Sequence, residues 1–269
     1  MSVQTLYTAA TGMQSLEAKM DVISNNLANV NTTAFKRDRA NFEDLFYRHK
    51  VVPGLLNSAS GNVTPTGVSI GLGSRVQSTQ TNHTQGAFQV TNGQLDVAIE
   101  GKGFFQVIDG ASGQRVYTRS GNFSTNANGQ VVLGSASDGR LVEPAITIPP
   151  DATNIVIGSD GTVMVQQFGS PQLQNAGQIQ LAMFVNPEGL LKIGENLYQA
   201  TDASGPETVG TPGTNGIGVV RQNALEASNV EPVQELIDLI TTQRAFELNS
   251  QAVQAGDQIL QLVSNMRRF

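Results

Sequence analysis

The chain contains no cysteine and no tryptophan, and its only histidines are His49 and His83. Without cysteine there are no disulfides, so packing must hold the fold in any compartment. Two histidines and no thiols are also too few ligands for an ordinary zinc site. Both histidines stand among polar or charged neighbours, which predicts surface positions. Without tryptophan, the aromatic platform common in sugar-binding enzymes is missing.

Long apolar runs and an excess of basic residues are also absent. No stretch approaches 18 apolar residues, so we expect no membrane span. Residues 1–14 have neither the basic start nor the apolar run of a signal peptide. The net charge is −6 and the pI about 4.9, which argues against a nucleic-acid partner. Between Lys50 and Glu100 only Arg75 and Asp96 are charged, and so uncharged a segment favours association with other chains.

Motifs that could support catalysis or ligand binding are fragmentary. Residues 71–73 and 101–103 resemble pieces of phosphate-binding loops but lack the full spacing and a strand–loop–helix context. Asp138-Gly139 and Asp160-Gly161 lack the alternating acidic residues of a calcium loop. Spacing alone leaves open an acidic pair for glycoside hydrolysis. We expect no catalytic residue, no cofactor and no metal site.

Both ends of the chain carry seven-residue repeats. Two rows near the N-terminus, offset by three residues, give the alternating spacing of a coiled-coil seam. One row is found near the C-terminus. The N-terminal rows are Leu6, Met13, Met20 and Leu27, and Ala9, Leu16, Ile23 and Val30; the C-terminal row is Leu239, Phe246, Val253 and Leu260. Neither helix can bury its stripe alone, so this pattern favours assembly.

The middle of the chain has a different pattern. From about residue 75 to 222, short apolar runs alternate with Asn-Gly and Asp-Gly dipeptides, which predict type I′ hairpins in an all-β domain. We therefore predict an α+β protein whose N- and C-terminal helices form a discontinuous coiled-coil domain, with an inserted all-β domain of short antiparallel strands. The predicted ranges are an N-terminal helical part at 1–36, an extended connector at 37–75, a β-rich outer domain at 76–222 and a C-terminal helical part at 223–269.

Local signals refine the helix ends. The first helix is predicted over residues 2–30, with a short amphipathic continuation within 35–50. The second is predicted over 228–266, because Ser228 and Glu231 have the spacing of a capping box and Pro232 suits a first turn.

Several motifs resemble those of the bacterial flagellar rod and hook proteins. Residues 24–36 read SNNLANVNTTAFK, close to the N-terminal signature of that family. The likeness covers nearly the whole chain, and within the family the opening and the length resemble the distal rod protein. The other matching stretches are 228–230, 234–237 and 242–247 near the C-terminus, and 95–105 and 117–121 at the start of the β domain.

The resemblance implies a structural subunit of the flagellar distal rod, without catalytic activity. Such a subunit polymerises into a rigid helical tube that transmits torque from motor to hook and carries the export channel. The implied partners are other copies of the chain, other rod proteins below, hook protein above, and the surrounding P- and L-ring bushing proteins. The implied location is the periplasm-spanning rod of the basal body, reached without a cleaved signal peptide.

Three alternatives remain at this point. The chain could be another rod or hook subunit of the same family. It could be a secreted carbohydrate-active β-protein with helical ends, or an adhesin-like binding module, although such a module would not need repeats at both ends.

The expected assembly interface combines the heptad rows with asparagines near the end of the first helix. Buried amides must be paired, and here they could fix the register between subunits. The expected residues are Leu6, Ala9, Met13, Leu16, Met20, Ile23, Asn25, Asn26, Leu27, Asn29, Val30, Leu239, Phe246, Val253 and Leu260. Ala34 stands where the family usually has glycine; if that position needs a positive φ, alanine costs about 1 kcal/mol.

Overall fold

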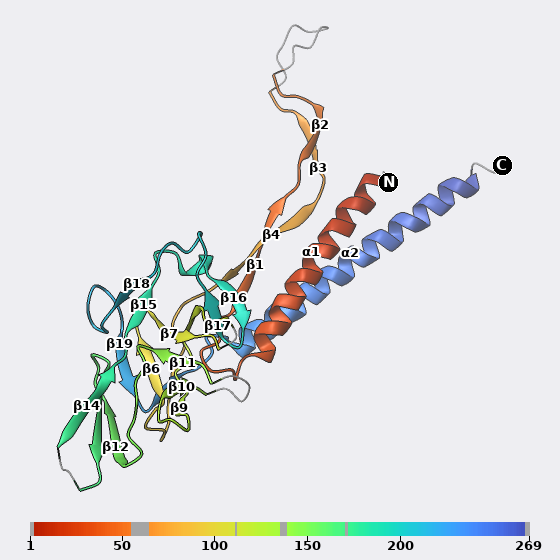
Figure 1. Ribbon diagram of the computed structural model, residues 1–269. Coiled ribbons are helices and arrows are strands. Elements are labelled where there is room, and N and C mark those ends of the chain that lie inside the picture. Colours follow the sequence, from red (N-terminus) through yellow and green to blue (C-terminus); the bar gives the residue numbers. More distant parts are fainter. Residues whose placement is uncertain (1–2, 55–64, 111, 135–138, 170–171, 267–269) are drawn as a thin grey trace. The chain divides into compact units, whose positions relative to one another are not determined.

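A computed structural model describes residues 3–54, 65–110, 112–134, 139–169 and 172–266 (Figure 1). It has a helix at each end and antiparallel strands between them, which makes the chain an α+β protein. No helix among the described residues is long and apolar enough to cross a membrane. The residues form two compact units: unit 1 is Met1–Ala28, Asp38–Thr81 and Glu231–Phe269, and unit 2 is Asn29–Arg37 and Asn82–Val230. This grouping differs from the four predicted ranges, since 38–75 belongs with the helices and 29–36 with the strands.

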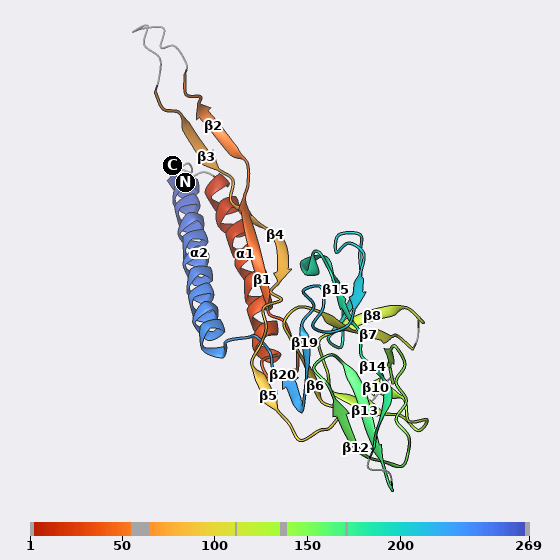
Figure 2. The same ribbon diagram turned by 90° about the vertical axis from the view of Figure 1, so that its left-hand side faces the viewer.

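In unit 1, helices α1 (Val3–Ala28) and α2 (Pro232–Met266) lie side by side and run in opposite directions (Figures 1 and 2). The capping-box prediction was wrong, because α2 begins four residues after Ser228. The Ser228 hydroxyl instead accepts a hydrogen bond from the Val230 N–H at 3.3 Å. Pro232 opens the helix, where its missing N–H has no intrahelical acceptor to lose.

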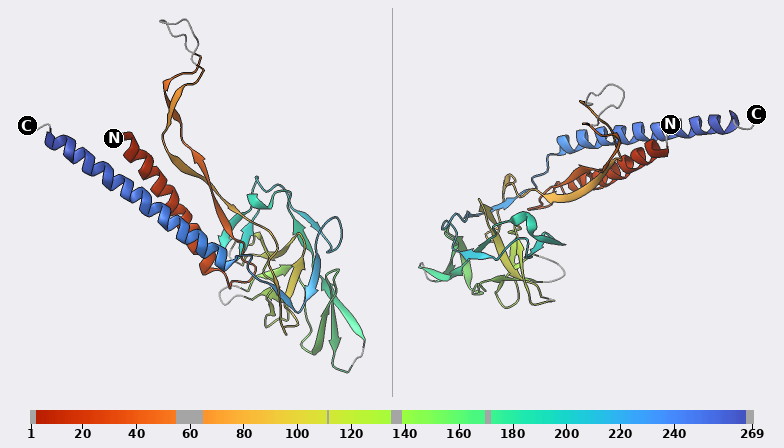
Figure 3. Two further views of the ribbon diagram at one scale, coloured as in Figure 1. Left: turned by 180° about the vertical axis from the view of Figure 1, so that it is seen from behind. Right: turned by 90° about the horizontal axis from the view of Figure 1, so that it is seen from above.

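The rest of unit 1 is a long two-stranded antiparallel ribbon (Figures 2 and 3). The Leu45 N–H donates to the Gly73 carbonyl and the Leu72 N–H to the Phe46 carbonyl, so pairing continues between the two halves of the ribbon. The predicted helical continuation was wrong, since cross-strand pairing fixes this stretch as extended backbone. The strands are β1 (Asp38–Asp44), which pairs with β4 (Ser74–Thr81), and β2 (Tyr47–Val51), which pairs with β3 (Val68–Gly71).

Unit 2 is built from short antiparallel strands. Its largest sheet has the order β16-β17-β8-β7-β11-β10-β9, with β15 joined to β7 and β18 joined to β15. The other sheets are β12-β13-β14, β19-β6 and β20-β5. The strands are β5 (Phe88–Val90), β6 (Val97–Glu100), β7 (Phe104–Ile108), β8 (Arg115–Thr118), β9 (Phe123–Thr125), β10 (Val131–Leu133), β11 (Leu141–Glu143), β12 (Ala152–Ile157), β13 (Thr162–Gln167), β14 (Leu173–Gln178), β15 (Leu181–Met183), β16 (Leu191–Gly194), β17 (Leu197–Gln199), β18 (Thr208–Gly210), β19 (Val219–Gln222) and β20 (Ala224–Glu226), and the 3-10 turn η1 is Pro187–Gly189.

The turns of two predicted hairpins differ from the predicted type. Asn128-Gly129 connects β9 to β10 and Asp160-Gly161 connects β12 to β13, as expected. In each pair only the glycine has a positive φ, 76° at Gly129 and 81° at Gly161. A type I′ turn needs two such residues. Each loop instead closes with the glycine N–H donating three residues back, to Asn126 or Gly158.

The main apolar core lies inside unit 2. Its side chains come from most of the strands, and branched aliphatic residues dominate because they fit the pleated surface of a sheet. Phe105 and Phe123 contact each other edge to face there, with ring centroids 5.0 Å apart. A second cluster contains Phe104, Tyr117, Ala182, Phe184, Leu190 and Tyr198.

Candidate functional site

Most of the predicted heptad residues lie on α1 and α2 and are buried or half-buried. Ile23 is buried, while Leu260 is 36% exposed near the described end of α2. Asn25 is exposed, and Asn29 and Val30 lie beyond the end of α1, in unit 2. The half-buried members of the seam are Leu6, Ala9, Met13, Leu16, Met20, Leu27, Leu239, Phe246 and Val253.

Sequence reasoning missed a second row on α2. Glu235, Thr242, Asn249 and Gly256 also lie seven apart, and each stands four residues before a member of the apolar row. Glu235, Thr242 and Gly256 are buried, and Asn249 is half-buried. The row escaped notice because its members are polar or small, although its regular spacing could have revealed it.

Two glycines show how closely the helices approach. A Cβ built on Gly256 would lie 2.6 Å from Leu6 Cδ2, well inside van der Waals contact. A Cβ built on Gly12 would lie 3.4 Å from Asn249 Nδ2, an ordinary contact distance. Gly256 therefore marks the tighter approach, and Gly12 has room for a methyl group.

Asn26 uses its side-chain amide within unit 1. Its Nδ2 donates to the Asp38 carbonyl at 2.9 Å, and its Oδ1 accepts from the Asp38 N–H at 2.9 Å. The same Nδ2 lies 3.3 Å from Glu235 Oε2. Asn26 and Glu235 are each about 2% exposed or less. The amide therefore fixes the start of β1 and the first turn of α2 against α1.

A face of α2 remains uncovered by α1. Leu236 and Ile240 are 44% and 48% exposed, and Val233 and Ile237 are 71% and 50% exposed. Their spacing of three, four and seven residues places them on one side of the helix. Four neighbouring exposed aliphatic side chains form an apolar patch of the kind that marks a protein interface.

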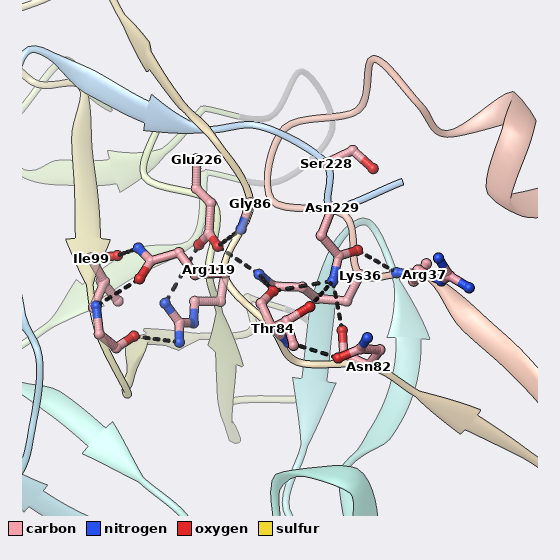
Figure 4. A network of polar contacts seen from close by, with 12 residues as sticks. Lys36, Arg37, Asn82, Thr84, Gly86, Ile99, Arg119, Glu226, Ser228 and Asn229 are labelled. Atoms are coloured by element: carbon pink, nitrogen blue, oxygen red, sulfur yellow. Dashed lines mark hydrogen bonds and ion pairs between the residues drawn. The ribbon is translucent and has the colours of Figure 1, made fainter. Parts of the chain in front are cut away.

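Unit 2 contains a buried cluster of charges that sequence reasoning did not predict (Figure 4). Lys36 Nζ lies 2.6 Å from Glu226 Oε1, and both side chains are fully buried. Arg119 approaches Glu226 Oε2 at 3.5 Å and donates to the Gly101 carbonyl at 2.8 Å. Glu226 Oε1 also accepts from the Gly86 N–H at 3.0 Å. One carboxylate thus holds a lysine, an arginine and a backbone amide.

Burial disfavours the charged form of both cations in this cluster. Loss of hydration lowers the pKa of Lys36 and of Arg119, while the charge of Glu226 acts in the other direction on each. The guanidinium of Arg119 stays charged because its ordinary pKa is so high. Both cations therefore depend on Glu226, and losing that carboxylate would leave two buried positive charges without a counter-ion.

His83 borders this cluster, and its predicted surface position was wrong. Its ring packs against Phe104 and Tyr198, with centroids 5.7 Å and 5.6 Å away. Burial, and after it the charges of the nearby cations Lys36 and Arg119, lower the pKa of His83 to about 4. Its buried Nδ1 finds no hydrogen-bond partner in the described part of the chain. The histidine is therefore neutral at neutral pH.

Ala34 has a left-handed backbone, with φ of 58°. Its N–H donates to the Glu226 carbonyl at 2.7 Å, and its side chain is fully buried. The position thus has the positive φ that favours glycine, and alanine accepts the strain there.

Among the described residues, no group of three or more His, Asp or Glu side chains is placed to hold a metal ion. The strongest buried charges are paired with one another. The geometry is suited to packing and positioning.

Three family models match successive parts of the chain. Residues 6–36 match "Flagella basal body rod protein", residues 98–165 match "Flagellar hook protein FlgE/F/G D1 domain" and residues 221–266 match "Flagellar basal body rod FlgEFG protein C-terminal". The first match covers most of α1 and the turn to Lys36, and the last covers β20 and α2. The matches define a class: axial subunits of the bacterial flagellum.

Curated relatives show which family within this class the chain belongs to. The "Flagellar basal-body rod protein FlgG" of Caulobacter vibrioides is 48% identical over 98% of this chain and 100% of its own length. In Bacillus subtilis, FlgG is 38% identical over 99% of this chain and 100% of its own, and the "Flagellar hook-basal body complex protein FlhP" is 32% identical over 98% and 100%. The chain belongs to the FlgG family of flagellar basal-body rod proteins, and is a structural subunit of the distal rod.

Among solved structures, the Helicobacter pylori flagellar hook protein FlgE2 matches 71% of this chain and 43% of its own at 13% identity. The TM-score of 0.24 is too low to support a shared fold.

Proposed function

We propose that this chain polymerises into a rigid helical tube that transmits torque from the flagellar motor to the hook and surrounds the export channel. The observation that carries the proposal is the apolar patch on α2. α1 covers one side of that helix, and Val233, Leu236, Ile237 and Ile240 remain exposed on it. In a polymer, a neighbouring copy would cover them.

The helix pair supports a coiled-coil interpretation. The two rows of α2 alternate in steps of four and three residues, and α1 has the same spacing, as in a coiled-coil seam. We place the pair on the inner wall of the tube and the strands of unit 2 toward its outer side. In this arrangement the chain is a scaffold without catalytic activity.

The ribbon of unit 1 provides a second candidate contact. Phe46 is 88% exposed and Tyr47 is 52% exposed, which is unusual for large aromatic side chains unless a partner covers them. We assign this surface to neighbouring copies.

Other rod proteins would meet the polymer below, hook protein above, and P- and L-ring proteins around it. The polymer would span the periplasm as part of the basal body, and its subunits would be exported without a cleaved signal peptide.

The test replaces one residue of the uncovered face. Ile240→Lys places a charge on the patch, and Gln14→Lys places the same charge on a polar, exposed position of α1, outside the patch, as the matched control. Electron microscopy of full-length protein should show tubes for the unchanged chain and for Gln14→Lys, and none for Ile240→Lys. Circular dichroism should show equal helix content in all three. Tubes formed equally well by Ile240→Lys would rule out this face as an interface, and an unchanged chain that never forms tubes would contradict polymerisation itself.

A further inference from the structure

The chain passes between its two units at four places. These crossings follow residues 28, 37, 81 and 230. On the unit 2 side, these crossings lie at the ends of three short segments, 29–37, 82–88 and 224–230. Any force that reaches unit 2 through the covalent chain must enter through these segments, so the contacts that fix them to each other have mechanical importance.

One side chain connects three of the four crossings (Figure 4). Asn229 Oδ1 accepts from the Arg37 N–H at 2.8 Å. Its Nδ2 donates to the Asn82 carbonyl at 2.9 Å, and to the Thr84 carbonyl and hydroxyl at 3.1 Å each. Arg37 and Asn82 end their segments at two of the crossings, and Asn229 lies one residue from the third. The Asn82 N–H also donates to the Arg37 carbonyl at 2.9 Å.

The buried charges join the same three segments a second time. Lys36, from the first segment, donates to the Thr84 carbonyl at 2.8 Å and pairs with Glu226. Glu226, from the last segment, accepts from the Gly86 N–H, and its own carbonyl accepts from the Ala34 N–H. Lys192 adds a hydrogen bond to the Lys36 carbonyl at 3.2 Å. Each segment is therefore held to both of the others by side-chain bonds as well as backbone bonds.

We propose that Asn229 is the central positioning residue of a clamp that transmits mechanical load into the strands of unit 2, with the Lys36–Glu226 pair as its buried support. This rests on the proposed torque-transmitting function. An amide suits the position because it accepts one hydrogen bond and donates two in a fixed plane. Aspartate has the same shape but would turn a carboxylate oxygen toward the Asn82 and Thr84 carbonyls. It should therefore break the hydrogen bonds to these carbonyls without leaving a cavity.

The experiment uses the full-length chain with Asn229→Asp, Asn229→Ser, and Asn186→Asp as control. Asn186 Nδ2 donates to the Ala203 carbonyl at 3.1 Å, so the control makes the same chemical change in unit 2 at a residue that adjoins no crossing. Hydrogen exchange on the monomer should accelerate at least about tenfold at the Asn82 amide in both Asn229 variants, and also at the Arg37 amide in Asn229→Ser, which loses the acceptor of that N–H. Exchange at both amides should stay unchanged in the control. Rods isolated from cells that express only the variant should be imaged for curvature, and swimming should be measured in viscous medium.

The proposal expects both Asn229 variants to form rods that vary more in curvature and drive slower swimming than those of the control. Rods as straight and swimming as fast as in the control, despite faster exchange, would overturn it. Unchanged exchange, or loss of all rods in both variants, would also overturn it, because Asn229 would then be irrelevant to the crossings or required for assembly itself. If the unchanged chain formed no rods, the proposed function would fail separately.

Discussion

Asn26 near the end of α1 and Glu235 in the first turn of α2 are 209 residues apart in sequence, yet the amide nitrogen of one lies 3.3 Å from the carboxylate of the other. Both side chains are buried. This contact sets the register of two antiparallel helices whose opposite ends meet at Leu6 and Gly256. A polar pair at one end and a close glycine contact at the other favour this alignment, because sliding α2 by one turn would separate Glu235 from Asn26 and move Gly256 away from Leu6.

Gly12→Ala should stabilise the helix pair. Glycine inside a helix costs about 1 kcal/mol relative to alanine, and the added methyl group meets Asn249 at an ordinary contact distance. We expect unit 1 to gain roughly 0.5–1 kcal/mol in free energy of unfolding, measured by urea denaturation followed by helix ellipticity. A loss of stability would mean that the helices pack more closely at Gly12 than the structure shows.

Leu16→Asp should abolish assembly. Leu16 is half-buried in the seam, and a carboxylate there costs several kcal/mol unless it escapes to water or takes up a proton. Motility should be lost in cells that express only this variant. Gln14→Asp, on an exposed position of the same helix, should leave cells motile. Motile cells carrying Leu16→Asp would show that this position is outside the seam.

Lys36→Met should destabilise unit 2 strongly. Removing one member of a buried ion pair leaves the other charge without compensation, which typically costs about 3–5 kcal/mol. Glu226 would keep only Arg119, at 3.5 Å, as a charged partner. The double variant Lys36→Met with Glu226→Gln should be less destabilised than the sum of the two single variants, because it removes both members of the pair, while Arg119 still loses its carboxylate partner. A double-mutant cycle from urea unfolding measures the coupling, and additive effects would contradict a direct interaction.

His83 should make the protein less stable in mild acid. Its pKa is about 4 in the folded state and ordinarily 6.5. Between these pH values the unfolded chain binds a proton at His83 and the folded chain does not. His83 therefore leaves the free energy of unfolding unchanged above pH 6.5 and lowers it progressively as the pH falls toward 4. Each pKa unit corresponds to about 1.4 kcal/mol, so this window costs up to about 3 kcal/mol.

His83→Phe should reduce that loss while keeping the aromatic contacts with Phe104 and Tyr198. His49→Phe serves as control, because His49 is exposed. Chemical denaturation at several pH values between 4 and 7 gives the slope for each variant. An equal slope in His83→Phe and the unchanged chain would mean that other groups account for the acid sensitivity.

The helices and hairpins could be predicted because their signals are local. The rows of α1 predicted a helix over residues 2–30, and the structure has it over Val3–Ala28. The Asn128-Gly129 and Asp160-Gly161 dipeptides marked real hairpins. In contrast, the short amphipathic continuation predicted within residues 35–50 was wrong, because this stretch contains strand β1. The conformation of β1 depends on pairing with β4, whose residues lie 30 or more positions later in the chain.

The buried cluster could not be predicted from the sequence. Lysine and glutamate are almost never fully buried unless paired, and nothing local identifies the partner of Lys36, which is 190 residues away. His83 was misjudged for a similar reason: its sequence neighbours are polar, while its spatial neighbours are the rings of Phe104 and Tyr198. The Ala34 position was recognised because the resemblance to the family pointed to a glycine site, and its φ of 58° agrees.

The hydrogen bond between Asn229 and the Asn82 carbonyl has a consequence for how such chains diversify. The stretch from residue 82 to 230 begins and ends at two points only one hydrogen bond apart, 2.9 Å between nitrogen and oxygen. A stretch whose ends meet can be exchanged, enlarged or trimmed while its attachment points keep the same spacing. The stretch is thus an insertion with adjacent ends, and a domain exchanged for it would have to restore the partners that Thr84 and Glu226 provide for Lys36.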